Sequence, residues 1–268
     1  MKAKGKPAIL KKWWLWAAIG VILLSIITGE GGMGLRMSKE QALEEAEDCL
    51  RYSAYSYEGL IEELTEYRGF TKNAAVYAAD NCGADWNEQA IDAAKSALKY
   101  SHYSHGGLVE SLEYMEFTGK QALYGADNCG ADWNEQAAEA AREKLKYSPS
   151  SYERLVERLV FDDFTKEQAA YGAENCGADW NEQAVEAAEN MLKYGHYSYD
   201  GLVEALEYDD FTSQQAAHGA DNCGADWYEQ ARKAAKDYGS GLFSDEDALR
   251  NFLEREGFTG DQIRKAMN

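Results

Sequence analysis

The stretch QALYGADNCGADWNEQA at residues 121–137 returns in slightly varied form every 47 residues, and this period decides the fold. A fixed period of this length marks a tandem array of one supersecondary unit, in which neighbouring units bury surface that a single unit cannot. The chain is therefore a short leading segment followed by five copies of a small module. Three sets of residues keep the register: Trp86, Trp133, Trp180 and Trp227; Cys82, Cys129, Cys176 and Cys223; and Phe70, Phe117, Phe164, Phe211 and Phe258.

The composition predicts that the modules are helical, because the chain has only two prolines and is rich in residues that favour helices. We expect an all-α protein in which a transmembrane helix precedes five three-helix, helix-turn-helix-like modules. The expected divisions are a basic amino terminus at 1–12, an anchor or signal at 13–28, a glycine-rich tether at 29–37, and modules at 38–84, 85–131, 132–178, 179–225 and, as a truncated capping copy, 226–268.

The charge of the modules is strongly negative. The chain has 27 Lys and Arg against 47 Asp and Glu, and five of the lysines lie within the first twelve residues. The remainder therefore has 22 basic and 47 acidic groups, a formal charge of −25. Such a surface repels nucleic-acid phosphate and attracts basic proteins, so we predict a protein partner and no nucleic acid. A simpler interpretation, in which the charge only keeps a repeat array soluble, stays open.

Residues 13–28, WWLWAAIGVILLSIIT, form an apolar run directly after the lysines. As a helix this run spans about 24 Å, and flanking tryptophans and lysines would extend it towards the headgroups of a ~30 Å hydrocarbon core. A cleaved secretory signal is the alternative, although the following TGEGGMG lacks a clean small-x-small pattern. A lipid-modified signal would need a cysteine directly after the run, and the first cysteine is Cys49. We favour an uncleaved single-pass anchor in the cell membrane, with the amino terminus inside and the repeats extracytoplasmic.

The first helix of each module is predicted to begin at a D-W-x-E motif. In the second copy, Asp85 can accept the unpaired amide hydrogens while Glu88 reaches back to complete a capping box. This helix is expected to end near Tyr100. The equivalent helix caps are Asp85, Asp132, Asp179 and Asp226.

Two more helices complete the module. Ser104 can cap the second helix, and Thr118 with Gln121 forms a capping box for the third. Gly130 can supply the left-handed residue that ends the third helix. Because helices this short are unstable alone, packing must hold them together.

The repeated aromatic and cysteine residues are best explained as a structural core. A large aromatic residue at the first turn of a helix that joins two modules belongs more naturally to a core than to a partner contact. Small buried residues likewise explain the repeated cysteines better than redox chemistry does. The predicted contact residues, which follow the cap of the second helix where side chains tend to face solvent, are Tyr57, His105, Tyr152 and Tyr199.

No motif points to catalysis or to a bound cofactor. Residues 80–88 concentrate oxygen ligands, but they lack the acid spacing of a calcium-binding EF-hand, and helix caps account for the acids. No nucleophile–base set and no phosphate loop recurs in the modules. We therefore predict a protein that is not an enzyme, with no catalytic residues, no metal and no cofactor.

The complete repeat motif resembles the Ltp-like repeat of host cell surface-exposed lipoproteins, over residues 38–268. The residues that carry this resemblance in the second copy are Tyr103, Ser104, Leu108, Phe117, Thr118, Gln121, Ala122, Asp127 and Asn128, followed by Asp132, Trp133 and Asn134. The resemblance implies tandem three-helix modules with helix-turn-helix-like pairs, encoded by bacteria or by phages, and it implies no catalytic residues.

The resemblance also implies a function. The phage-encoded members are superinfection-exclusion proteins that are displayed outside the membrane and block DNA injection through the tape measure protein of an incoming phage. The leading hypothesis is therefore a membrane-anchored, surface-exposed and non-enzymatic binding array that excludes phage DNA by engaging a basic phage tail component. The alternative is a structural or adhesive protein of the cell envelope with no phage role.

Overall fold

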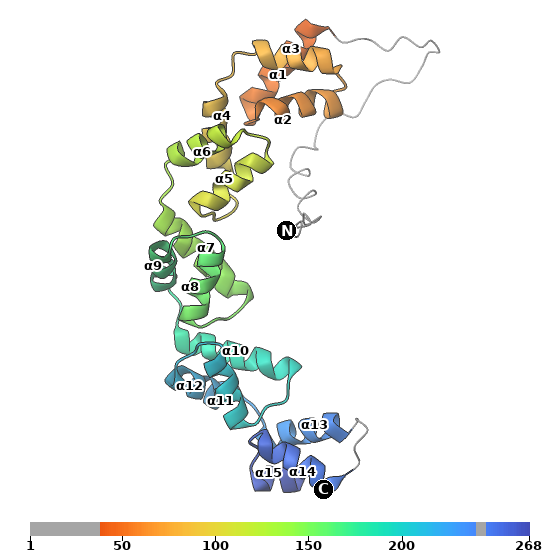
Figure 1. Ribbon diagram of the computed structural model, residues 1–268, viewed down its shortest axis with the longest axis vertical. Helices are drawn as coiled ribbons and strands as arrows, with labels where there is room; N and C mark the ends of the chain where they lie inside the picture. Colours follow the sequence, from red (N-terminus) through yellow and green to blue (C-terminus); the bar gives the residue numbers. More distant parts are fainter. Residues whose placement is uncertain (1–37, 240–244) are drawn as a thin grey trace, which may run out of the picture. The chain divides into compact units, whose positions relative to one another are not determined.

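The computed structural model describes residues 38–239 and 245–268, and the predicted anchor and tether lie outside them. The described residues fold into fifteen α-helices and one π-helical segment without any strand (Figure 1). The prediction of an all-α repeat protein is therefore confirmed for this part of the chain. Among these residues, none of the helices combines the length and the apolar character needed to cross a membrane.

Each module has three helices, here called A, B and C in chain order. Module 1 has α1 (Lys39–Tyr52), α2 (Tyr57–Glu62) continued by η3 (Glu63–Tyr67), and α3 (Lys72–Asn81). Module 2 has α4 (Trp86–Ala97), α5 (His105–Tyr114) and α6 (Gly119–Asn128). Module 3 has α7 (Trp133–Tyr147), α8 (Tyr152–Phe161) and α9 (Lys166–Asn175). Module 4 has α10 (Trp180–Tyr194), α11 (Tyr199–Tyr208) and α12 (Ser213–Asn222). Module 5 has α13 (Trp227–Gly239), α14 (Glu246–Arg255) and α15 (Gly260–Ala266).

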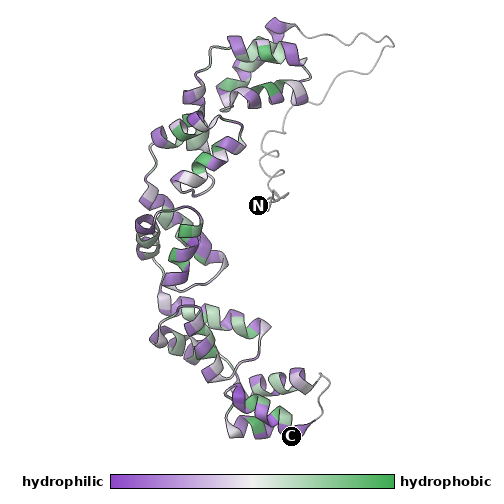
Figure 2. Cartoon of the chain, viewed as in Figure 1, coloured by the Kyte–Doolittle hydropathy of each residue, from purple (hydrophilic) through white to green (hydrophobic). Residues whose placement is uncertain are grey.

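Every module has a small hydrophobic core of its own. In module 3, Leu155 and Leu159 from helix B meet Ala141 from helix A and Ala169 from helix C, and Phe164 closes the cluster. All five side chains are buried. The apolar residues lie on the inward faces of the helices, while the outward faces are polar (Figure 2). Because alanine contributes much of each core, helices A and C can pack closely.

A glycine in helix C allows this close packing in modules 2 to 4. A Cβ atom at Gly172 would lie only 2.7 Å from the carbonyl oxygen of Ala137 in helix A. Gly125 and Gly219 meet the carbonyl oxygens of Ala90 and Ala184 at the same distance. A residue with a side chain at these positions would push helices A and C apart.

The helix caps follow the sequence pattern with one difference. The capping boxes at Ser38 and Gln41 and at Thr118 and Gln121 have both of their hydrogen bonds, as predicted. At Asp85, one carboxylate oxygen accepts from the amides of Asn87 and Glu88 at 2.9 and 3.4 Å. The structure shows only this aspartate half of the predicted box, since Glu88 makes no hydrogen bond to the backbone amide of Asp85. The other aspartates in this register, Asp132, Asp179 and Asp226, bind their helices in the same way.

Two local differences distinguish the first two modules. Helix α4 ends at Ala97 rather than near Tyr100, because the amides of Lys99 and Tyr100 bond to carbonyls three residues back and tighten the last turn. Module 1 has one additional residue between Leu64 and Phe70, and this part of the chain holds the π-helical segment η3. A single-turn π-bulge of this kind takes up the additional residue within helix B.

Candidate interaction surface

The repeated tryptophans connect each module to the one before it. Trp133 is the first residue of helix A in module 3, yet it is half-buried against the core of module 2. The ring of His105, at the start of helix B in module 2, contacts the Trp133 indole edge-on at a centroid distance of 5.2 Å. Trp86, Trp180 and Trp227 have the same position and meet the rings of Tyr57, Tyr152 and Tyr199 at 5.5 to 5.6 Å.

The four predicted contact residues are therefore engaged inside the modules. The Tyr57 hydroxyl donates to Asp80 in helix C at 2.8 Å, and a His105 ring nitrogen lies 2.8 Å from Asp127. In modules 3 and 4, the hydroxyls of Tyr152 and Tyr199 donate to the equivalent acids, Glu174 and Asp221 respectively. These aromatic rings link the tryptophan to an acid of helix C, so they do not project freely into solvent as the sequence suggested. Their role as partner contacts stays a prediction.

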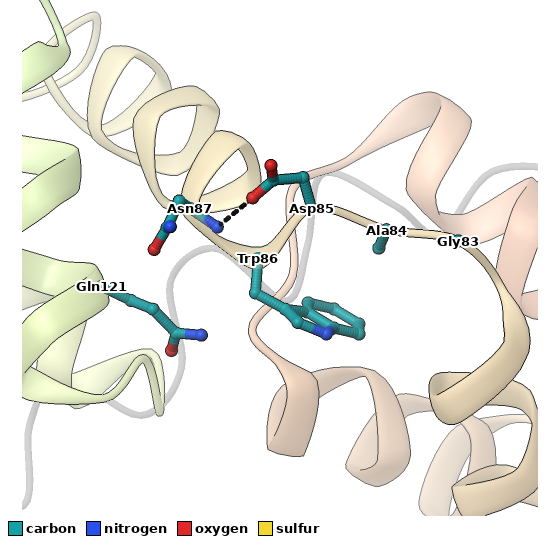
Figure 3. Close-up of a pocket in the computed structure, with 6 residues that line it drawn as sticks. All are labelled: Gly83, Ala84, Asp85, Trp86, Asn87 and Gln121. Carbon is teal, nitrogen blue, oxygen red and sulfur yellow. Dashed lines mark hydrogen bonds between the residues drawn. The ribbon is translucent and has the colours of Figure 1, made fainter.

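A shallow pocket of about 390 Å³ opens beside Trp86 at the joint of modules 1 and 2. Figure 3 shows Asp85, Trp86 and Asn87 on one side and the Gln121 amide, from α6, on the other. A similar pocket of about 440 Å³ lies at Trp180 and Gln215. Both pockets are open to solvent, and their polar residues also serve as helix caps, so we assign no ligand to them.

Two of the joints, between modules 3 and 4 and between modules 4 and 5, are closed by serines that cap helix B. Ser198 accepts the amide hydrogen of Gly201 at 2.9 Å, and its own hydroxyl donates to the carbonyl oxygen of Glu256 in module 5 at 2.6 Å. Ser151 likewise donates to the carbonyl oxygen of Asp209 in module 4 at 2.7 Å. Both serines are almost completely buried. A buried hydroxyl that caps one module and binds the next fixes the contact between them.

The turn between helices B and C, whose carbonyl oxygen accepts the serine hydrogen bond at these two joints, contains a residue with a positive φ angle. Glu116, Asp163 and Asp210 have φ angles of 64° to 66°, and Gly69 and Gly257 occupy the equivalent positions with φ angles of 76° and 81°. Only glycine adopts this conformation without strain. The turn between helices B and C is thus strained in modules 2 to 4, where an acid replaces the glycine.

Two sets of exposed aromatic residues recur along the array. The A-ladder lies at or just beyond the ends of the A helices, and the B-ladder lies at the ends of the B helices. Exposure is highest at Tyr194 and Phe161, with 91% and 88% of the residue accessible. The A-ladder consists of Tyr52, Tyr100, Tyr147 and Tyr194, and the B-ladder of Tyr67, Tyr114, Phe161 and Tyr208.

These ladders were not predicted from the sequence. Within each ladder the aromatic residues are 47 positions apart, except that Tyr52 lies 48 positions before Tyr100. This repetition is the sequence signal from which the ladders could have been predicted. Exposure depends on how a helix end packs, however, and a tyrosine at a helix end can equally be buried. Repeated exposure of large aromatic residues is typical of an interaction surface.

The repeated cysteines are free thiols that lie mostly inside the modules. Cys129, Cys176 and Cys223 are buried and donate weak S–H hydrogen bonds to carbonyls three residues back, whereas Cys82 is only half-buried. Cys49 is buried too, and all five thiols are free. In the part of the chain that the structure describes, no three His, Cys, Asp or Glu side chains gather as they would around a metal ion.

Comparison with known proteins gives one match. The Ltp family, described as host cell surface-exposed lipoprotein, matches the chain twice, at residues 132–175 and 179–223. No curated protein and no solved structure matches the chain. The two matched segments coincide with helices A to C of modules 3 and 4. The resemblance suggested by the repeat motif is thereby confirmed for modules 3 and 4, which are similar to the Ltp family.

Proposed function

We propose that this protein is a membrane-anchored, non-enzymatic binding array on the outer side of the cell membrane that excludes phage DNA. Its modules capture a basic component of the phage tail and thereby block DNA injection. Three findings support the proposal: the Ltp match, the formal charge of −25 beyond residue 12, and the exposed aromatic ladders. The matched family is not an enzyme family.

The observation that carries the proposal is the repetition of exposed rings on an acidic surface. Tyr100, Tyr147 and Tyr194 are at least 75% accessible, so burial in the monomer does not explain them. Aromatic side chains are enriched at protein interfaces because they bury a large area with little loss of conformational entropy. Equivalent rings on successive modules can bind a repetitive or extended partner many times over, which raises avidity without new contacts.

The proposal requires that the modules lie outside the membrane. We propose that residues 13–28 anchor the chain and that the preceding lysines keep the amino terminus inside. Protease applied to intact, wall-stripped cells should then release an acidic helical fragment that begins near Leu35. Survival of that fragment until the cells are lysed would place the modules inside and exclude this function.

The functional test compares adsorption with DNA entry. Cells that express the protein, and cells with an empty vector, are challenged with a broad panel of phages. We expect equal adsorption but reduced DNA entry for at least one phage in the expressing cells. If DNA entry is equal in both strains for every phage, the exclusion role is wrong.

A structural or adhesive role in the cell envelope remains the second candidate, since ladders of aromatic rings would also suit attachment to an envelope component. Deletion of the gene distinguishes the two roles. Altered envelope integrity or adhesion with unchanged phage sensitivity would support the structural role. Altered phage sensitivity with an intact envelope would support exclusion.

A further inference from the structure

At the joint of modules 3 and 4, an arginine of the chain is bound by the turn between helices B and C. Arg154 lies at the start of helix B in module 3. Its Nη2 donates to the carbonyl oxygen of Tyr208 at 3.3 Å, and its Nε lies 3.3 Å from Asp210 Oδ2. Nη2 is also 4.0 Å from Asp209 Oδ1. The turn thus offers a guanidinium group one carbonyl and two carboxylates beside an exposed aromatic ring.

The residue in the register of Arg154 is a glycine in the neighbouring modules. Module 1 has Gly59, module 2 has Gly107 and module 4 has Gly201. The contact between modules is nevertheless retained. A Cβ atom at Gly106, next to Gly107, would lie 3.5 Å from the Cβ of Asp163 in module 3. One at Gly59 would lie 3.7 Å from the carbonyl oxygen of Met115 in module 2. The same turns therefore face the same helix start without an arginine.

The acids of these turns lack a cation where the arginine is missing. At the joint of modules 2 and 3, Lys144 of module 3 pairs with Asp162, but Asp163 makes no side-chain hydrogen bond or ion pair among the described residues. At the joint of modules 1 and 2, Glu116 is equally unpaired within the described part of the chain. Burial and the nearby Glu62 and Glu58 of module 1 raise the pKa of Glu116. The carboxylates of two modules thus gather there without a neutralising group.

We infer that the joints of modules 1 and 2 and of modules 2 and 3 are receptors for arginine side chains of the partner protein, with Arg154 showing how the guanidinium is bound. The aromatic neighbours are Tyr114 and Phe161 of the B-ladder, whose exposed rings can contact the bound cation. Arginine suits this arrangement better than lysine because its planar group can serve a carbonyl and a carboxylate together. This inference rests on the proposed function and specifies the partner as an arginine-bearing segment.

Photo-crosslinking of the full chain tests the inference. The probe is the neutral-ended peptide acetyl-Gly-photoleucine-Arg-Gly-amide, and the control peptides carry lysine or glycine in place of arginine. Crosslinked residues are located by mass spectrometry at physiological ionic strength. We expect arginine-dependent crosslinks at residues 114–116 and 161–163, and few at residues 208–210, where Arg154 already occupies the turn.

Two reciprocal variants make the test specific. Arg154→Gly should add crosslinks at residues 208–210, and Gly107→Arg should remove those at residues 161–163. Module 3 carries an arginine in this register, so the fold accommodates it, and an unchanged melting temperature checks each variant. Asp163→Asn should also remove the crosslinks at 161–163, while the charge-matched Asp92→Asn, an exposed helix-A acid, should not.

The outcomes separate this inference from the proposed function. Arginine-dependent crosslinks that spread over the acidic surface and ignore Arg154→Gly and Gly107→Arg would overturn the inference, while a basic partner would still be supported. Equal crosslinking by all three peptides would overturn both the receptor sites and the basic partner.

Discussion

Replacing Trp133 with alanine tests the contact that joins modules 2 and 3. Trp133 is half-buried against the core that contains Leu108, Leu112 and Phe117. Loss of a fully buried tryptophan costs about 3–5 kcal/mol, so a half-buried one should cost roughly 2 kcal/mol. The edge-on contact with His105 adds about 0.5–1.5 kcal/mol. The expected loss is therefore ~2.5–3.5 kcal/mol.

Hydrogen exchange measures where this loss occurs, and urea denaturation measures its size. Because the modules of an array stabilise mainly their neighbours, protection should fall in module 2 and at the start of module 3, and much less in module 5. The matched control is Tyr147→Ala, a ladder residue with 75% of its surface exposed, which should change stability very little. A Trp133→Ala protein with unchanged protection, or one no less stable than the control, would refute the assignment of Trp133 to the joint.

Three further predictions concern packing, charge and thiol reactivity. Gly172→Ala should lower the free energy of unfolding by about 1–3 kcal/mol, since its Cβ would meet the Ala137 carbonyl at 2.7 Å, and unchanged stability would show that helices A and C tolerate the methyl group. Glu116→Gln should stabilise the protein at pH 7, because burial, and after it the nearby Glu62 and Glu58, raise the pKa of Glu116 and disfavour its carboxylate in the folded state. This gain in stability should vanish below the ordinary pKa of 4.5, where the acid is protonated in both the folded and the unfolded state. A gain in stability that is independent of pH would contradict the electrostatic cause. Burial raises the pKa of Cys49 to about 11, so this thiol should resist a disulfide reagent at pH 8 until the protein unfolds, and rapid labelling of folded protein would contradict its burial.

Much of the fold could be predicted from the sequence because it depends on local signals. The capping boxes and the left-handed Gly130 are each specified by a few adjacent residues, and the 47-residue register is visible directly in the repeated sequence. The reciprocal half of the Asp85 box is not formed, since the Glu88 carboxylate makes no hydrogen bond to the Asp85 amide. Whether a glutamate side chain turns back onto the cap depends on its conformation, which spacing alone does not provide.

The surface was harder to predict, since it depends on contacts between distant residues. Tyr57 follows a helix cap and so looked exposed, but its ring packs on Trp86, 29 positions later in the chain. Phe161 was not singled out in the sequence, yet it lies almost fully in solvent. The arginine-binding turn at Asp209 and Asp210 became visible only when the structure brought Arg154 to it.

The most direct test of the proposed function measures phage DNA entry in cells that carry the wild-type protein or a B-ladder variant. The variant replaces all four exposed rings, Tyr67, Tyr114, Phe161 and Tyr208, with serine. Its melting temperature and surface display should match those of the wild type, because these side chains add little to any core. We predict that the wild type blocks DNA entry without reducing adsorption, and that the variant restores entry. Equal blocking by a folded, displayed variant would contradict a role for these rings, and unimpeded entry past the wild type for every phage would contradict exclusion itself.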